Sequence, residues 1–321
     1  MKKKQLLFGI LGCLAASISW GAMFPILDHA LKYMNPYYFS FFRYGAVACI
    51  LALCLLLKEG KKAFLLEGKS KYLFLFSAMA FPIYNFLFLG QMLMGHNGVM
   101  VASIMESLLP IFSILFMWVI KGIKPKKYMI LSICIAFTGA FFVITKGNIH
   151  FLLNLKGNIL SLCFMIIGVI GWMIYTMGTD YFREWSTLRY STLTCIIGVA
   201  MTGIVLVVST WTGLLAVPTI KSLSIIKYDL LFMITLPGLL ALICWNYGIK
   251  VLTPINGVLF INLLPITTLL IMVIKGYQMK SFDIIGIILV ITALIQYNIY
   301  HRKENRIAAH NNNVHRIQKS G

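Results

Sequence analysis

The sequence predicts an all-α polytopic membrane protein with ten transmembrane helices, arranged as two inverted repeats of five helices. Three observations predict this fold class: the composition, the number of long apolar segments, and an internal duplication. Of the 321 residues, 60% are hydrophobic and only 12% are charged, and the mean hydropathy is +0.87. Soluble domains carry roughly 45–50% apolar and about 25% charged residues. The composition therefore excludes a soluble protein.

The first apolar segment, residues 6–27, follows the basic start Met1-Lys2-Lys3-Lys4 and so begins like a secretory signal peptide. Its apolar run continues past Cys13 to Leu27, which is the length of a full membrane span rather than of a signal peptide. We therefore expect an uncleaved first helix.

Nine further segments have about the 20 largely apolar residues that a helix needs to cross the hydrocarbon core. They are residues 36–57, 72–94, 98–120, 128–145, 157–178, 189–211, 229–249, 255–274 and 283–300. Only short connections remain between them, so we expect no separate soluble domain. The last segment, residues 301–321, is polar and basic, and we expect a disordered cytoplasmic tail.

The net charge of +19 comes from 28 Lys and Arg residues against 9 Asp and Glu residues. With the N-terminus inside, the predicted spans place 20 of these basic residues on the cytoplasmic side and 7 outside, with Arg43 within a span. The positive-inside rule therefore predicts that both termini are cytoplasmic. Because basic residues lie on both sides of the membrane, we expect no nucleic-acid partner.

The seven cysteines all lie in apolar segments, with no Cys-x-x-Cys pair and no neighbouring His cluster. Small buried hydrophobic side chains are the expected role of such cysteines. We expect no disulfide framework, no metal and no cofactor.

The two halves of the chain resemble each other at an offset of about 150 residues. Residues 42–50 align with residues 188–196, and Pro82 and Pro237 are 155 residues apart, as are Pro110 and Pro265. Each half holds five spans, an odd number, so the second half enters the membrane in the opposite orientation. The duplication predicts a first repeat over residues 1–146, a second over residues 147–300, and a substrate site near the midplane between them.

Several short motifs resemble the EamA-type transporters of the drug/metabolite transporter superfamily. They are Trp20-Gly21, Asn35-Pro36, Arg43, Ser107-Leu108-Leu109-Pro110 and Asn262-Leu263-Leu264-Pro265, and the resemblance covers about residues 5–300. It implies a bundle of five plus five helices that moves small metabolites, often outward, across the bacterial inner membrane. It also implies transport without ATP, and several members of the family are believed to exchange protons.

The chain departs from the family pattern in two places. The predicted ninth span ends in Lys275-Gly276-Tyr277-Gln278, where the family commonly has a Gly-Glu pair. The predicted fourth span carries Glu106, where the family more often has an apolar or small residue. The first departure concerns the outer end of the span, and the second concerns the mechanism.

Glu106 is the most informative residue of the sequence. A carboxylate at mid-span costs a few kcal/mol on insertion scales, so it is expected to be protonated or paired with a cation. We predict that it couples transport to protons or binds a cationic group of the substrate. The alternative is a neutral acid that is hydrogen-bonded for packing, or one in a displaced, wetter span.

Arg43 is the strong cation that we place inside a span. It can bind a substrate carboxylate with both arms of its guanidinium, or pair with Asp28 at the outer mouth. The alternative is that its long side chain reaches out to the membrane interface.

Aromatic and amide side chains at mid-span are predicted to line the substrate cavity. The aromatic residues are Trp20, Tyr84, Trp172, Tyr175 and Trp245, and the amides are Asn246 and Asn262, with Asn85 and Gln91 as further candidates. Aromatic rings with polar tips suit a flat or amphipathic substrate. The alternatives are interfacial aromatic belts and hydrogen bonds between helices.

Four mid-span prolines are predicted to kink or hinge their helices, because proline removes a backbone donor and clashes with the preceding turn. They are Pro82, Pro110, Pro237 and Pro265.

These expectations combine into a secondary active transporter of the bacterial inner membrane. It would export a small metabolite or drug, amino-acid-like or aromatic and cationic, by alternating access and with protons as the candidate counter-ion. The expected partners are this substrate, protons and the lipid bilayer, and the chain acts as a monomer or a homodimer. The alternatives are a uniporter, exchanger or importer of the same fold, or a polytopic membrane sensor or enzyme.

Overall fold

The computed structural model describes residues 3–122, 124–145, 155–252, 257, 260–261, 263–293, 295–297 and 299–300. Within these residues all regular secondary structure is helical. The predicted site residue Asn262 and the predicted tail lie outside them. The chain forms two compact units, Met1–Leu109 with Asn148–Met279 and Pro110–Gly147 with Lys280–Gly321.

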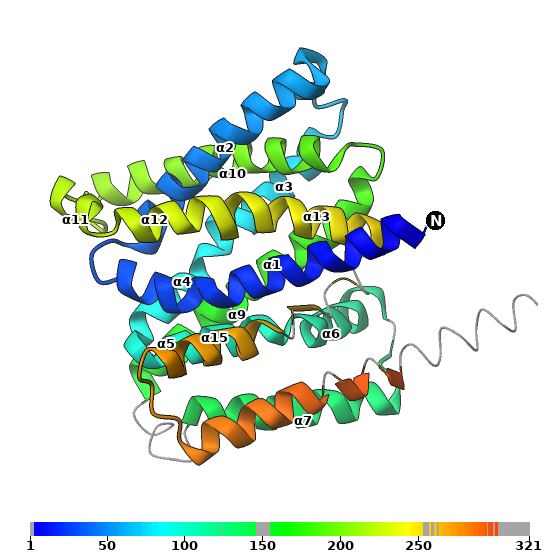
Figure 1. Ribbon diagram of the computed structural model, residues 1–321, viewed down its shortest axis with the longest axis vertical. Coiled ribbons are helices and arrows are strands. Elements are labelled where there is room, and N and C mark those ends of the chain that lie inside the picture. The colour runs from blue at the N-terminus through cyan, green and yellow to red at the C-terminus, as the bar shows by residue number, and fades with distance from the viewer. Residues whose placement is uncertain are drawn as a thin grey trace, which may run out of the picture. The chain divides into compact units, whose positions relative to one another are not determined.

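The first unit holds most of the helices in Figure 1. In chain order these are α1 (Lys3–Ala30), α2 (Pro36–Glu59), η1 (Lys61–Phe64), α3 (Ser70–Ala78), η2 (Met79–Ile83), α4 (Asn85–Met94), η3 (Gly95–Asn97), α5 (Gly98–Ser107), α9 (Leu155–Gly178), η4 (Thr179–Phe182), α10 (Thr187–Trp211), α11 (Ile220–Ile225), α12 (Lys227–Met233), η5 (Ile234–Leu240), α13 (Ala241–Leu252) and α15 (Leu263–Ile274).

Six continuous helices are long and apolar enough to cross a membrane: Lys4–Ala30, Pro36–Glu59, Ser70–Met94, Ile159–Phe182, Thr187–Trp211 and Lys227–Leu252. A seventh results if α5 and the start of α6 (Leu109–Lys121) are counted as one span interrupted at Leu108. The remaining three predicted spans coincide with shorter apolar helices, Lys127–Val143, Leu263–Ile274 and Ser281–Tyr297. The chain is therefore a multi-pass helical membrane protein, and its ten spans remain a prediction.

Helices that lie far apart in the sequence pack side by side in the first unit. α1 lies along α13 and α15, α2 packs on α10, and α4 packs on α9. In Figure 1, α12 and α13 follow one another alongside α1. The N-cap residues Asn35 and Ser186 begin α2 and α10, because each side chain accepts a hydrogen bond from a first-turn amide.

Glycine allows the backbones of α4 and α9 to approach each other closely. A Cβ atom on Gly168 of α9 would lie 2.5 Å from the backbone nitrogen of Leu87 in α4. Small residues serve this purpose between membrane helices, where packing rather than the hydrophobic effect drives association. Gly168 therefore sets the distance between these two helices.

Two of the four predicted hinge prolines lie within π-helical turns. Pro82 lies in η2, and Pro237 lies in η5. A π-helical turn is wider than an α-helical turn. Its altered hydrogen-bond pattern accommodates the bond that is lost because proline has no amide hydrogen. These two prolines, which align in the duplication, share the same local structure.

The other two predicted hinge prolines begin helices. Pro110 and Pro265 lie in the first turns of α6 and α15. The missing amide hydrogen of proline costs little there, because the first amides of a helix have no partner within it. Leu108 separates α5 from α6, so the predicted fourth span is interrupted two residues after Glu106.

The second unit contains α6 from Pro110 onward, α7 (Lys127–Thr145) and the helix Ser281–Tyr297. Gly139 of α7 and Gly286 face each other, because a Cβ on either would lie 2.5 Å from the carbonyl oxygen of the other. The ring of Tyr128 stacks on those of Tyr297 and Tyr300. A small-residue contact and stacked rings thus pair α7 with the helix Ser281–Tyr297.

The different surroundings of Gly168 and Gly45 predict opposite effects when each is replaced by alanine. Gly168→Ala forces the backbones apart and should lower the free energy of unfolding by about 1–3 kcal/mol, as overpacking does. Gly45→Ala on α2 meets no atom within 4 Å and should stabilise the helix by about 0.5–1 kcal/mol. Thermal unfolding in detergent measures both, and a Gly168→Ala protein as stable as the Gly45→Ala protein would contradict the assigned contact.

Candidate functional site

Eight of the nine predicted substrate-binding residues are described, and all eight lie in the first unit. None of these side chains is more than 4% exposed: Trp20, Arg43, Tyr84, Glu106, Trp172, Tyr175, Trp245 and Asn246. They come from α1, α2, the η2–α4 junction, α5, α9 and α13. The structure thus gathers them in one interior rather than on the lipid-facing surface.

Five of these residues form a continuous set of ring contacts, which we call the aromatic cluster. The ring centroid of Trp20 lies 5.2 Å from that of Trp172 and 5.1 Å from that of Trp245. Trp172 also lies 5.0 Å from both Tyr84 and Tyr175. Edge and tilted contacts of this kind stabilise aromatic pairs. The interfacial alternative does not describe these five rings, because they are buried among one another.

The π-helical turn η5 supplies a hydrogen-bond acceptor to the aromatic cluster. The amide of Ala241 bonds to the carbonyl of Leu236, five residues earlier, in place of the usual partner four residues earlier. The carbonyl of Pro237 accepts instead from the indole Nε1 of Trp20, at 3.1 Å. This hydrogen bond therefore pairs the Pro237 carbonyl of the turn with the buried indole N–H of Trp20 on α1.

Glu106 is fully buried at the end of α5, and Tyr84 is its hydrogen-bond donor. The Tyr84 hydroxyl lies 2.9 Å from each carboxylate oxygen and donates to them. Tyr84 stands directly after η2, so the turn that contains Pro82 aims the phenol at α5. Tyr84 thus links the carboxyl group to the aromatic cluster.

Arg43 is buried about two turns into α2, with 1% of its surface exposed. It donates to the Tyr44 hydroxyl at 2.6 Å and to the Met23 sulfur at 3.3 Å, and its guanidinium lies 4.3 Å from the centre of the Tyr44 ring. Among the described ion pairs, none joins Arg43 to Asp28 or Glu106. Arg43 is therefore a buried cation whose hydrogen-bond acceptors are neutral.

Asn246 connects the aromatic cluster to α10. Its Nδ2 atom donates to the Tyr175 hydroxyl at 2.7 Å and to Ser191 Oγ at 2.8 Å. The Tyr175 ring stacks on Tyr190 of α10 at 5.5 Å. The amide thus fixes the position of Tyr175 from two neighbouring helices.

Three of the eight described site residues hold buried polar atoms without a hydrogen-bond partner, as do the further candidates Asn85, at Nδ2, and Gln91, at Oε1. In the three site residues these atoms are Nε of Arg43, Nε1 of Trp172 and Oδ1 of Asn246. Buried polar atoms are nearly always paired, because an unpaired one costs about 1–3 kcal/mol. Within the described residues, two donors and one acceptor of the site therefore have no protein partner.

The two further amide candidates make contacts between helices. Asn85 accepts from the Ser40 hydroxyl, and Gln91 donates to the carbonyl of Phe24 at 3.0 Å. The alternative of helix–helix hydrogen bonding therefore describes both contacts. Sequence reasoning missed Met23 and Tyr44 as partners of Arg43, and only the adjacency of Tyr44 to Arg43 offered a signal.

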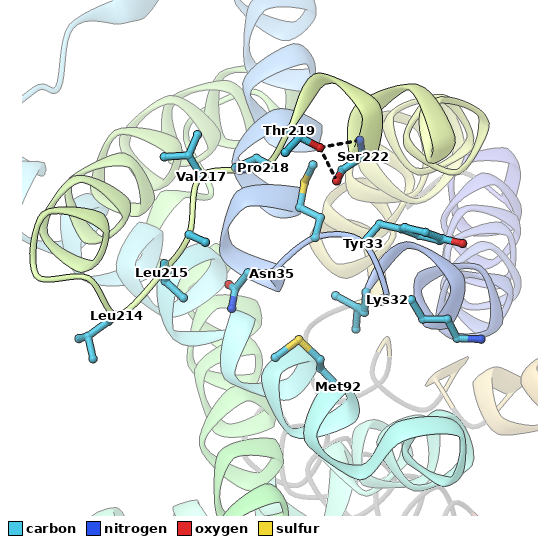
Figure 2. Close-up of a pocket in the computed structure, with 13 residues that line it drawn as sticks. Lys32, Tyr33, Asn35, Met92, Leu214, Leu215, Val217, Pro218, Thr219 and Ser222 are labelled. Atoms are coloured by element: carbon cyan, nitrogen blue, oxygen red, sulfur yellow. Dashed lines mark hydrogen bonds between the residues drawn. The ribbon is translucent and has the colours of Figure 1, made fainter.

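A cavity of about 420 Å³ opens in the first unit at the junction of α1 with α2. Figure 2 shows it between residues 31–35, Met92 of α4 and the segment 214–222 that follows α10. Lys32 and the hydrogen-bonded pair Thr219 and Ser222 are among its polar residues. None of the eight described site residues lines it, so this cavity and the aromatic cluster are separate features.

In the described part of the chain, no three His, Cys, Asp or Glu side chains gather closely enough to hold a metal ion. The described site residues present one carboxyl, one guanidinium, aromatic ring faces and single polar atoms.

Comparison with known families assigns the chain. The profile of the EamA-like transporter family matches residues 7–145 and, a second time, residues 159–298. The chain belongs to the EamA-like transporter family. It is thus a membrane transporter of the drug/metabolite transporter superfamily, as the sequence motifs predict, and family membership agrees with a transporter rather than an enzyme.

Two relatives and one solved structure support this assignment. The chain is 60% identical over 306 residues to the uncharacterized transporter YrdR of Bacillus subtilis (strain 168), which covers 95% of each protein. It is 26% identical over 287 residues to the uncharacterized transporter YyaM of the same organism, covering 88% of this chain and 90% of YyaM. A crystal structure of another protein matches 94% of this transporter with a TM-score of 0.64 at 14% identity, which shows the fold alone.

The bond between Tyr84 and Glu106 predicts a measurable coupling energy. Tyr84→Phe removes the donor from a buried carboxyl, which should lower the free energy of unfolding by about 1–3 kcal/mol. In a Glu106→Met background the same substitution should cost much less, because no carboxyl remains to be satisfied. Thermal unfolding of the four proteins in detergent gives the coupling energy.

The matched control for this cycle is Tyr38→Phe, which removes a hydroxyl that bonds Thr210 at 2.7 Å. Its cost should be the same with and without Glu106. A Tyr84→Phe cost that does not depend on Glu106 would refute the pairing.

Proposed function

We propose that this transporter is a secondary active exporter of the bacterial inner membrane, which moves a small metabolite or drug by alternating access in exchange for protons. The observation that carries the proposal is Glu106, a carboxyl with no exposed surface and one hydrogen-bonding side chain, Tyr84. Ionisable groups in the interior of a membrane protein are expensive and mark ion or substrate paths. Glu106 can carry a proton when neutral and bind a cation when ionised.

The aromatic cluster and Arg43 support an amino-acid-like or an aromatic, cationic substrate. Tryptophan and tyrosine rings bind flat or apolar groups and attract cations to their faces. The unpartnered Arg43 Nε is a donor suited to a carboxylate, and Glu106 is suited to an ammonium group. A molecule with both charges would satisfy both groups.

Alternating access requires helices that bend near the site, and two observations support it. The aligned prolines Pro82 and Pro237 both lie in π-helical turns, and each turn contacts the aromatic cluster through Tyr84 or Trp20. The family profile also matches the chain twice. We therefore retain ten spans in two inverted repeats, residues 1–146 and 147–300, with both termini cytoplasmic as the basic residues predict. Pro110 and Pro265 remain predicted hinges within this scheme.

The substrate is identified by two successive measurements. Metabolites outside cells are first compared, without preselection, between cells that express the transporter and cells that lack it. Compounds enriched outside are then tested for uptake into inverted membrane vesicles, which is the direction of export. Uptake into right-side-out vesicles alone would favour an importer of the same fold.

Glu106→Gln should abolish transport driven by a pH gradient and leave exchange of labelled for unlabelled substrate largely intact. The amide keeps the shape of the side chain and the contact with Tyr84, but it cannot gain or lose a proton. Both activities are measured in vesicles with the compound identified above.

Glu184→Gln is the matched control, because the Glu184 side chain is 83% exposed and should change neither activity. Gradient-driven transport that persists in folded Glu106→Gln protein would instead support a uniporter or exchanger in which Glu106 only binds substrate.

A further inference from the structure

Both carboxylate oxygens of Glu67 are bonded to the segment that leads into α10. Arg189 Nη2 lies 2.8 Å from Glu67 Oε1, and the indole Nε1 of Trp185 donates to Glu67 Oε2 at 2.7 Å. Arg189 also donates to the carbonyl of Leu65 at 2.6 Å. These bonds join the loop between α2 and α3 to the segment between α9 and α10.

A third helix is tied to the same point. Lys250 of α13 donates to the backbone carbonyl of Trp185 at 2.6 Å, and the guanidinium of Arg189 lies 4.2 Å from the centre of the Trp185 ring. We call Glu67, Trp185, Arg189 and Lys250 the latch. Its bonds join the loop that leads into α3, the beginning of α10 and the end of α13.

The backbone at Glu67 is strained. Its φ of 49° lies in the left-handed region, which no other described non-glycine residue adopts. A side chain with a Cβ atom disfavours this conformation, and such strain persists where the surroundings enforce it. Glu67 and Gly68, whose φ is 73°, are the central residues of a tight turn. The turn is closed by the hydrogen bond from the Lys69 amide to the Leu66 carbonyl at 2.9 Å. The two bonds of the Glu67 carboxylate attach this turn to Trp185 and Arg189.

Glu67 is the ionised partner of the latch at neutral pH. The hydrogen bond from Arg189, and then that from Trp185, lowers the pKa of the Glu67 carboxyl below its usual value. Lys69 adds a smaller favourable charge. Since the pKa is lowered in the folded state, the contribution of the latch is complete at neutral pH and is lost only as the pH falls through that lowered pKa.

Ring contacts connect the latch to the aromatic cluster. Trp185 packs on Phe182 at 4.7 Å, Phe182 on Tyr190 at 5.3 Å, and Tyr190 stacks on Tyr175 of the cluster. Lys250 and Asn246 are four residues apart on α13, and therefore share one face of that helix. A rearrangement around Tyr175 or Asn246 would therefore move residues that contact Trp185 or lie on the same helix face as Lys250.

A cavity lies at the opposite ends of α2 and α10. The cavity in Figure 2 lies where α2 begins, at Asn35, and where α10 has ended, at residues 214–217. The latch lies in the loop between α2 and α3 and at the beginning of α10. The latch and the cavity therefore lie at opposite ends of α10.

We propose that the latch is a gate that closes one end of the substrate path, and that it opens and closes during the transport cycle. The proposal rests on the proposed function, in which the aromatic cluster binds the substrate. In the proposed topology this end faces the cytoplasm, so opening the latch admits substrate from inside the cell.

Cys195 is a native reporter for the gate. It lies on α10, is fully buried, and its thiol contacts the carbonyl of Tyr44 on α2 at 3.6 Å. Separation of α2 from α10 would expose it. Its reaction with N-ethylmaleimide in the purified full-length protein is followed by mass spectrometry of the peptide, with the exposed Cys49 as internal reference.

Glu67→Arg and Arg189→Glu should each raise the labelling rate of Cys195 at least tenfold, because each places like charges in the latch. The double substitution restores opposite charges and should return the rate to within about threefold of that of the natural chain. Glu67→Gln, a milder change, should raise the rate severalfold. Glu184→Arg, which alters an exposed ion pair with Lys69, is the matched control and should leave the rate within about twofold.

Unchanged Cys195 labelling in folded Glu67→Gln and Glu67→Arg proteins would overturn the gate. A double variant that folds but labels as fast as the single variants would overturn the assigned pairing. Because labelling needs no substrate, these results are independent of the Glu106→Gln experiment. A working gate with no proton coupling would therefore be recognised as such.

Discussion

A carboxyl group in an apolar interior must find hydrogen-bond donors, and much of the first unit is arranged to provide one for Glu106. Tyr84 is that donor, and its ring packs on Trp172. Trp172 in turn contacts Trp20, which reaches the carbonyl of Pro237. Burying such a group without a partner costs several kcal/mol. A continuous chain of contacts therefore connects the carboxyl of Glu106 on α5 with the Pro237 carbonyl in η5.

The same constraint applies to the backbone. In lipid, every amide and carbonyl must be satisfied within the protein. Proline at mid-helix removes a backbone donor, and at Pro82 and Pro237 the helix forms a wider, π-helical turn. Each turn places its neighbouring groups against the aromatic cluster, so the positions that weaken the helix ladder are also those that build the site.

The sequence was sufficient to predict the helical membrane fold, because the apolar segments are long and the charged residues cluster at their ends. It also predicted that a set of mid-span residues lies together, because polar and aromatic groups there pack against one another rather than against lipid. These residues are Trp20, Tyr84, Glu106, Trp172, Tyr175, Trp245 and Asn246. It did not reveal that Arg43 bonds Tyr44 and Met23, because the rotation of α2 against α1 is set by packing. The cavity of Figure 2 was not predicted either, because loops and helix ends that are distant in sequence form it.

The latch escaped prediction for a related reason. Its bonds join residues such as Glu67 and Arg189, which belong to connections that carry no periodic pattern. The alignment of residues 188–196 with residues 42–50 makes Arg189 the counterpart of Arg43 and favours a structural or gating role for both, but it does not predict their partners. In the structure Arg189 lies in the first turn of α10, whereas Arg43 lies deeper in α2. The two arginines therefore meet different environments, one ion-paired and one buried among neutral acceptors.

The hydrogen bond from Trp20 to Pro237 makes the shape of one helix depend on the packing of another. The Ala241 amide bonds five residues back, so the Pro237 carbonyl accepts from the indole of Trp20 instead of from that amide. A carbonyl has two lone pairs, so in a regular α-helical turn the two donors would share this oxygen and approach it from different directions. The orientation of the Trp20 ring on α1 therefore depends on the helical pitch of η5.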